Sequence, residues 1–119
     1  MTISVGTEVP DVTLFRATSD GPEAVNTKEF FADRKIVLFA VPGAFTPTCS
    51  AKHLPGFIAK ADEIKAKGVD EIACLASNDA FVMQEWAKSQ NADGITMLSD
   101  GDLAFVDATG LELDLTGRF

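Results

Sequence analysis

The sequence predicts an α/β fold built on a central parallel βαβαβ unit. Two continuous apolar runs, residues 35–41 and 71–77, have the pattern of strands that are buried on both faces. A helical apolar stripe separates them, and a third short apolar run over residues 95–98 follows after a second helical pattern. Because such units use right-handed crossovers, we expect the three strands to lie parallel in one sheet.

An N-terminal β extension is expected before this unit. Alternation of apolar and polar residues over 10–15 predicts a strand, and the cluster at 19–22 predicts a turn. Thr27 can cap a short helix over residues 28–32.

The helices of the central unit follow from apolar spacing and stop signals. A long helix is expected from Thr46 to about Lys67, bent or broken where Pro55 and Gly56 interrupt it. Further helices are expected over 80–89 and, capped by Asp100, from 101 to about 109. No strand is read after them, so the last parallel strand is expected to lack an antiparallel neighbour.

Composition narrows the class of protein. A length of 119 residues predicts one domain, residues 1–119, and a net charge of −8 without a basic cluster argues against nucleic acid and anionic membrane partners. No apolar run approaches the ~18 residues of a membrane helix, and no signal peptide is read, so we expect a cytoplasmic protein. Two cysteines and one histidine cannot supply a four-ligand structural zinc site, which leaves redox or nucleophilic chemistry, or inert thiols.

Cys49 is the candidate reactive residue, because it follows the first buried strand at the carboxyl edge of the predicted sheet. Thr46 is a good N-cap and Pro47 suits the first helical position, which places Cys49 in the first helical turn. Unpaired N–H groups and the positive end of the helix dipole favour a thiolate there. The Thr46 hydroxyl can hydrogen-bond the sulfur or a bound oxygen, and Pro42 can shield the sulfur from water.

Pro42, Thr46 and Cys49 form the pattern Pro-x-x-x-Thr-x-x-Cys, and here the sequence resembles the peroxiredoxins. The strings at 41–50 and 78–83 are similar to the type II, peroxiredoxin-5-like branch, and the resemblance runs from about residue 5 to 115. It implies a thioredoxin-like fold, usually a homodimer, and thiol-dependent reduction of hydrogen peroxide and alkyl hydroperoxides to water or alcohol. No cofactor or bound metal is expected.

The resemblance also implies a role for each motif residue. Cys49 would be the peroxidatic cysteine, which attacks the peroxide and becomes a sulfenic acid. Thr46 would hydrogen-bond the peroxide oxygens, Pro42 would limit solvent access, and the N–H groups of Thr48 and Cys49 would line the oxygen site. A thiol reductant such as glutaredoxin, thioredoxin or glutathione would complete the cycle.

Two interpretations of Cys74 stay open. It lies at the spacing at which plant-type members of this branch place a resolving cysteine, which would form a disulfide with Cys49. It also sits in the middle of a predicted buried strand, as an inert core thiol does. In the second case an external thiol would resolve Cys49.

His53 lies four residues after Cys49, so the two can share a helix face and form a Cys–His pair as in cysteine hydrolases. Such an enzyme also needs an orienting group and an oxyanion hole, which the sequence does not place. We therefore favour a surface or interface histidine.

Members of the resembled family continue with further strands, a last helix and an arginine that holds the thiolate and the peroxide. This sequence stops before that region, and Arg118 lies in a context similar to the stretch upstream of it, so the role is not carried over to Arg118. We therefore expect a domain truncated at its C-terminus, with part of the sheet edge uncovered. The alternative function is a weakly active or inactive module that acts by association or partner binding.

Overall fold

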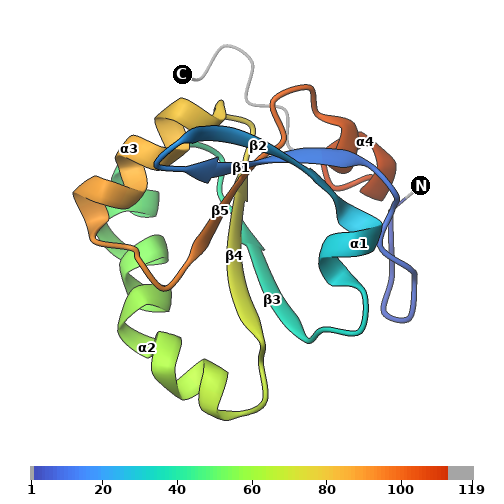
Figure 1. Cartoon of the computed structure of the whole chain (residues 1–119), viewed down its shortest axis with the longest axis horizontal. Coiled ribbons are helices and arrows are strands. Elements are labelled where there is room, and N and C mark those ends of the chain that lie inside the picture. The colour runs from blue at the N-terminus through green and yellow to red at the C-terminus, as the bar shows by residue number, and fades with distance from the viewer. Residues whose placement is uncertain (1, 113–119) are drawn as a thin grey trace.

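The computed structural model describes residues 2–112, which form one five-stranded sheet covered by helices (Figure 1). The elements in chain order are β1 (Thr13–Thr18), β2 (Gly21–Asn26), α1 (Thr27–Phe31), β3 (Ile36–Ala40), the π-helical turn η1 (Cys49–His53), α2 (Leu54–Ala66), β4 (Glu71–Ala76), α3 (Ala80–Gln90), β5 (Thr96–Ser99) and α4 (Ala104–Thr109).

The strand order is β2-β1-β5-β4-β3. Strands β3, β4 and β5 run parallel, which confirms the predicted βαβαβ unit. Strand β1 runs antiparallel both to β2 and to β5. The expected α/β architecture with an N-terminal β extension is therefore the one observed.

The prediction that β5 lacks an antiparallel neighbour was wrong. Strand β1 lies along its outer edge, with Phe15 opposite Ser99 and Arg16 opposite Leu98. The pairing joins segments that are far apart in the chain, and local periodicity carries no information about it.

The first strand also begins later than the expected range of 10–15. The Thr27 hydroxyl donates to the Pro10 carbonyl and accepts from the Val12 N–H, so this stretch is tied to the start of α1. The cap of α1 is Asn26, whose side chain accepts from the Glu29 N–H, and not Thr27 as expected.

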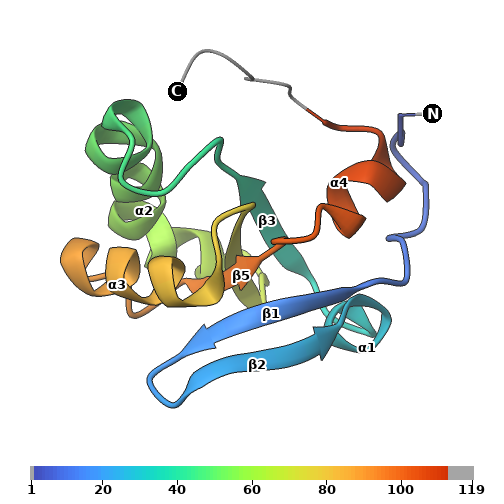
Figure 2. The same cartoon turned by 90° about the horizontal axis from the view of Figure 1, so that it is seen from above.

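Helices cover the two faces of the sheet separately (Figure 2). Helices α2 and α3 lie on one face, and α1 and α4 lie on the other. Side chains of β4 alternate between the two resulting apolar cores. Cys74 packs on the α2–α3 side in a cluster with Leu54 and Trp86, whereas Leu75 packs on the other side in a cluster with Phe30.

Strand β3 is the last strand of the sheet within the described part of the chain. Its side chains reach both cores, Phe39 in one and Leu38 in the other, which explains why its sequence is apolar throughout. Ile36 and Val37 are only half-buried, however, because no strand pairs with the outer edge of β3 among the described residues.

Of the bend or break expected at Pro55, no break is observed, and the helix instead has a π-helical turn directly before the proline. The Leu54 N–H donates to the carbonyl of Cys49, five residues earlier, which makes the turn before the proline a π turn. The wider turn accommodates a residue that has no N–H to donate. At the other end of the chain, α4 begins at Ala104 and not at 101, although the Asp100 carboxylate does cap it by accepting from the Phe105 and Val106 N–H groups.

Candidate active site

Cys49 lies where the loop that follows β3 enters the long helix, at the carboxyl edge of the parallel strands. It is buried, with 4% of its surface exposed. The first helical hydrogen bond of this segment runs from the Ser50 N–H to the Thr46 carbonyl, at 2.9 Å. The amides of Thr48 and Cys49 therefore precede the helical ladder, where N–H groups lack intrahelical acceptors. The helical turn that carries Cys49 thus offers backbone donors that suit an anionic or oxygen-bearing ligand.

Thr46 has a defined hydrogen-bonding role. Its hydroxyl donates to the Gly43 carbonyl at 2.7 Å, across a tight turn of the loop. Since a hydroxyl has one hydrogen and two lone pairs, the Thr46 oxygen is left as an acceptor. Because this bond uses the hydroxyl hydrogen, Thr46 can meet a bound oxygen as an acceptor and not, as the sequence suggested, as a donor.

Pro42 is exposed at the beginning of the same loop, directly after the buried Val41. Pro42, Thr46 and Cys49 are thus carried by one short segment between β3 and the helix. Two hydrogen bonds attach this segment to β4 and the residues after it. The Val41 N–H donates to the Leu75 carbonyl, and the Ala44 N–H donates to the Asn78 side chain.

Trp86 of α3 contacts the turn that carries Cys49. The indole is completely buried, and its N–H donates to the Ser50 Oγ at 3.0 Å. The Phe45 ring lies 6.5 Å from the Trp86 ring, centroid to centroid. Neither Ser50 nor the Trp86 N–H was assigned a role from the sequence, because the bond joins residues that only the fold brings together.

Cys74 lies in the middle of β4, between Phe39 of β3 and Met97 of β5, and is completely buried. Burial raises the pKa of its thiol to about 12, with a further contribution from the nearby Cys49. Both cysteines are free thiols in the same apolar cluster. At neutral pH Cys74 is therefore a protonated thiol, which is a poor nucleophile.

His53 packs among aromatic rings. Its ring centroid lies 5.2 Å from that of Phe39 and 5.7 Å from that of Phe57, and these two phenyl rings stack at 3.9 Å. This environment accounts for His53 as a packing residue between β3 and the long helix. It supports the structural interpretation over a Cys–His pair.

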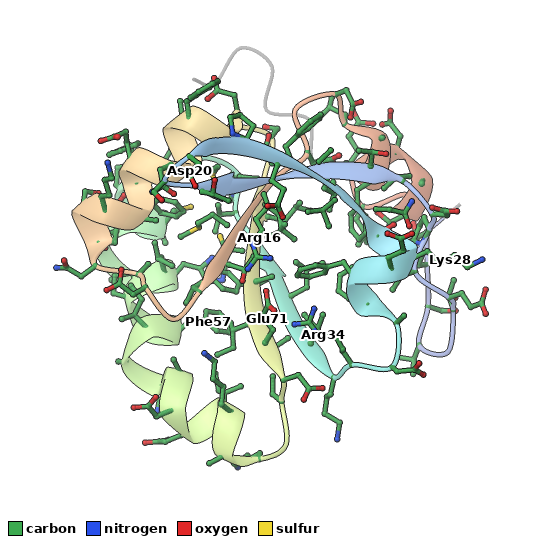
Figure 3. All side chains as sticks on the ribbon, in the orientation of Figure 1. Arg16, Asp20, Lys28, Arg34, Phe57 and Glu71 are labelled. Carbon is green, nitrogen blue, oxygen red and sulfur yellow. The ribbon has the colours of Figure 1, made fainter. Side chains whose placement is uncertain are left out.

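The side chains of the two arginines among the described residues, Arg16 and Arg34, lie near Glu71 (Figure 3). Arg34 donates to Glu71 at the start of β4 and lies over the Phe30 ring, and Arg16 faces the same carboxylate. Burial alone raises the pKa of Glu71, but hydrogen bonds from Thr96 and Arg34 and the charges of both arginines outweigh it, so the pKa of Glu71 is lowered.

Arg118 lies outside the described residues. Within residues 2–112, no group of three histidine, cysteine or acidic side chains is arranged to hold a metal ion. No helix of that same range is long and apolar enough to cross a membrane.

Comparison with known proteins identifies the family of the chain. The redoxin family matches residues 4–119. Peroxiredoxin-2D of Arabidopsis thaliana is 48% identical over 98% of this chain and 73% of its own length. The chain belongs to the type II peroxiredoxins. The rice protein "Peroxiredoxin-2E-2, chloroplastic" is 55% identical, and the chain spans only 54% of its length.

Solved structures of peroxiredoxins share the thioredoxin-like fold described above. Reduced Prx3 of Vibrio vulnificus, solved in complex with hydrogen peroxide, superimposes with a TM-score of 0.94 at 53% identity, over 98% of this chain and 74% of that one. Peroxiredoxin 5 of Alvinella pompejana superimposes with a TM-score of 0.83 at 37% identity, over 94% of this chain and 71% of that one. The chain thus has the peroxiredoxin fold over most of its own length.

Proposed function

We propose that this peroxiredoxin is a thiol peroxidase that reduces hydrogen peroxide and alkyl hydroperoxides at Cys49. The observation that carries the proposal is the position of Cys49 in the first turn of the long helix, beside amides that precede the helical ladder and one turn from Thr46. The hydrogen peroxide in the Vibrio vulnificus relative supports the choice of substrate class.

The proposed reaction is a displacement at oxygen. The Cys49 thiolate attacks one peroxide oxygen, so that an S–O bond forms and the O–O bond breaks. The leaving oxygen departs with the electron pair, takes up a proton and is released as water or alcohol, and the sulfur is oxidised to a sulfenic acid. Thr46 accepts a hydrogen bond from the peroxide hydroxyl, the Thr48 and Cys49 amides donate to the oxygens, and Pro42 limits access of water.

We further propose that an external thiol resolves the sulfenic acid. The burial of Cys74 inside β4 and the raised pKa of its thiol support this choice over an internal disulfide. Glutaredoxin, thioredoxin and glutathione are the candidate reductants. An internal disulfide would require the turn at Cys49 to unwind and β4 to open, because two cysteine Cα atoms must come within about 7 Å.

The test is peroxide consumption with dithiothreitol as the reductant. The native chain and Cys74→Ser are expected to consume hydrogen peroxide at similar rates, and Cys49→Ser is expected to match the protein-free blank. Circular dichroism checks that both variants fold. Full activity in Cys49→Ser would refute the proposal.

A second candidate function is association without turnover, which would make the chain a weakly active or inactive module. The observation that favours it is the unpaired outer edge of β3 within the described residues, where Ile36 and Val37 are half-buried. For the active peroxidase we propose a homodimer, which is the usual state that the family resemblance implies. Light scattering over a range of concentrations, run beside the peroxide assay, separates an active dimer from inactive concentration-dependent oligomers.

The cytoplasm is the location that we propose from the sequence. Two plant relatives carry "chloroplastic" in their names, so a plastid is the competing location. Immunolocalisation of the complete protein in its own cells decides between them.

A further inference from the structure

Asn78 is the second residue after β4, and it joins three segments of the chain. Its side-chain Oδ1 accepts a hydrogen bond from the Ala44 N–H at 2.8 Å. Its backbone carbonyl accepts from the Ser99 Oγ at 2.6 Å, and Ser99, at the end of β5, is only 3% exposed. Asn78 is thus fixed to the sheet on one side and holds the loop before Cys49 on the other.

The loop that it holds contains an unfavourable backbone conformation. Phe45 has a φ of 63°, in the left-handed region that side chains with a Cβ rarely adopt. The Phe45 side chain is 55% exposed, and its ring lies 6.5 Å from that of Trp86. Packing of Phe45 itself therefore does little to hold this conformation.

Hydrogen bonds on both sides of Phe45 hold it in place. The residue before it, Ala44, is bound to Asn78, and the residue after it, Thr46, donates to the Gly43 carbonyl. The loop is also closely packed here, because a Cβ on Gly43 would lie 3.2 Å from the Thr46 side chain. The Val41 N–H bond to the Leu75 carbonyl fixes the beginning of the loop to β4, and the Asn78 bond fixes it directly beside Phe45.

The direction of the loop sets the position of the proposed chemistry. Thr46 ends the loop, and its carbonyl accepts the first helical hydrogen bond of the turn that carries Cys49. A shift of the loop therefore moves the Thr46 hydroxyl relative to the sulfur. Because displacement at oxygen requires alignment of the attacking and leaving atoms, such a shift lowers the rate even when the thiolate remains available.

We infer that Asn78 is a positioning residue for the reaction at Cys49, which holds the strained loop so that Thr46 and the sulfur face the peroxide together. This inference rests on the proposed peroxidase function. Asn78 acts through the loop, because its side-chain oxygen is occupied by the Ala44 N–H.

The test compares Asn78→Leu, which removes the acceptor at similar size, with Asn78→Asp, which keeps it. Asn26→Leu is the matched control, because the Asn26 side chain also accepts a hydrogen bond from a backbone N–H, at the start of α1. Helix α1 lies on the opposite face of the sheet from α2 and α3 (Figure 2). Two quantities are measured in each: hydrogen exchange at the Ala44 amide, and the ratio of the Cys49 rates with hydrogen peroxide and with iodoacetamide. Alkylation needs the thiolate but not the alignment, so the ratio isolates positioning.

In Asn78→Leu, Ala44 exchange is expected to rise by about tenfold and the rate ratio to fall by about tenfold. Asn78→Asp is expected to keep the slow exchange of the native chain, and Asn26→Leu to change neither quantity. Adding Phe45→Gly to Asn78→Leu is expected to restore part of the ratio, because glycine adopts a positive φ without strain.

An unchanged ratio in folded Asn78→Leu, or an equal fall in Asn26→Leu, would overturn the inference. If Asn78→Leu does not fold, Asn78→Ser, which shortens the acceptor, is measured in the same way. If the native chain does not react with peroxide, the proposed function fails. The role of Asn78 in the loop is tested separately, because unchanged hydrogen exchange at Ala44 in Asn78→Leu would overturn it.

Discussion

The two cysteines offer a comparison within one apolar cluster. Cys49 and Cys74 are both buried, and both lie between the sheet and the α2–α3 layer. Cys49 stands at a chain junction, where a loop becomes a helix and amides lack helical acceptors. Cys74 lies inside a strand that is paired on both sides, with β3 and with β5, and burial raises the pKa of its thiol to about 12.

The difference teaches that burial alone does not decide the reactivity of a thiol. A buried sulfur beside free backbone donors can carry a charge, whereas one surrounded by apolar side chains on a strand cannot do so at neutral pH. We therefore expect the local backbone to decide which of the two thiols reacts.

The largest expected effect is selective alkylation of the native protein. Iodoacetamide at pH 7 is expected to label Cys49 and to leave Cys74 unlabelled, because a pKa of about 12 leaves a thiolate fraction of only about 10⁻⁵ at Cys74. In concentrated urea both are expected to react. Peptide mass mapping reads the two sites, with Cys49→Ser and Cys74→Ser as single-thiol controls. Equal labelling of both thiols in the native state would remove the basis of the comparison.

The next effect concerns the hydrogen bond from the Trp86 N–H to Ser50, in the turn that carries Cys49. Ser50→Ala leaves the buried Trp86 N–H without its acceptor, so we expect a loss of about 1–3 kcal/mol in the free energy of unfolding, measured in urea. Peroxide reduction is expected to slow as well. Ser77→Ala is the control, because Ser77 is exposed, and its effect is expected to stay within about 0.5 kcal/mol. Equal stability of the two variants would show that the bond does not hold the turn.

A smaller effect on the free energy of unfolding is expected at Glu71, the first residue of β4, which also contains Cys74. The pKa of Glu71 lies below its ordinary value of 4.5, so its charged form stabilises the fold above that pH, and the contribution is lost as the pH falls below it. Glu71→Gln is expected to lose roughly 1 kcal/mol at pH 7, and the difference from the native chain is expected to shrink towards about pH 3.

Urea unfolding at both pH values measures this. Glu63→Gln is the control, because the ion pair of Glu63 with Lys60 is exposed and its loss is expected to have almost no effect. A difference between Glu71→Gln and the native chain that grows as the pH falls would contradict the assignment of the carboxylate.

The smallest expected effect is at His53. Its aromatic contacts give it a packing role, so His53→Gln is expected to change the peroxide rate of Cys49 by no more than about twofold. Loss of a general base would lower the rate by about a hundredfold or more. Stopped-flow kinetics distinguish the two outcomes, and the larger loss would restore the Cys–His interpretation.

Much of the fold was predictable because local patterns carry it. The apolar runs that became β3, β4 and β5 and the helical stripe of α2 are properties of neighbouring residues. The pairing of β1 with β5 was not predictable, because it depends on contacts between distant segments. At Pro55 an irregularity was predictable but its form was not, since the π turn that precedes the proline has no simple sequence signal.

The candidate site likewise has residues that were predictable from the sequence and residues that were not. Pro42, Thr46 and Cys49 were found because one motif contains all three. Asn78 and Trp86 were missed as partners of that segment, because each reaches it from another element. A polar residue directly after a parallel strand was the one available signal for Asn78, since the carboxyl ends of parallel strands meet at one edge of the sheet.

The most direct test is the intact mass of the native protein after one equivalent of hydrogen peroxide. The account predicts a gain of one oxygen, located on the Cys49 peptide, while Cys74 can still be alkylated after unfolding. Cys74→Ser is expected to show the same gain, and Cys49→Ser none. A loss of two hydrogens in the native chain, with neither cysteine open to alkylation, would show a Cys49–Cys74 disulfide and contradict the inert Cys74. An unchanged mass would contradict the reactive Cys49.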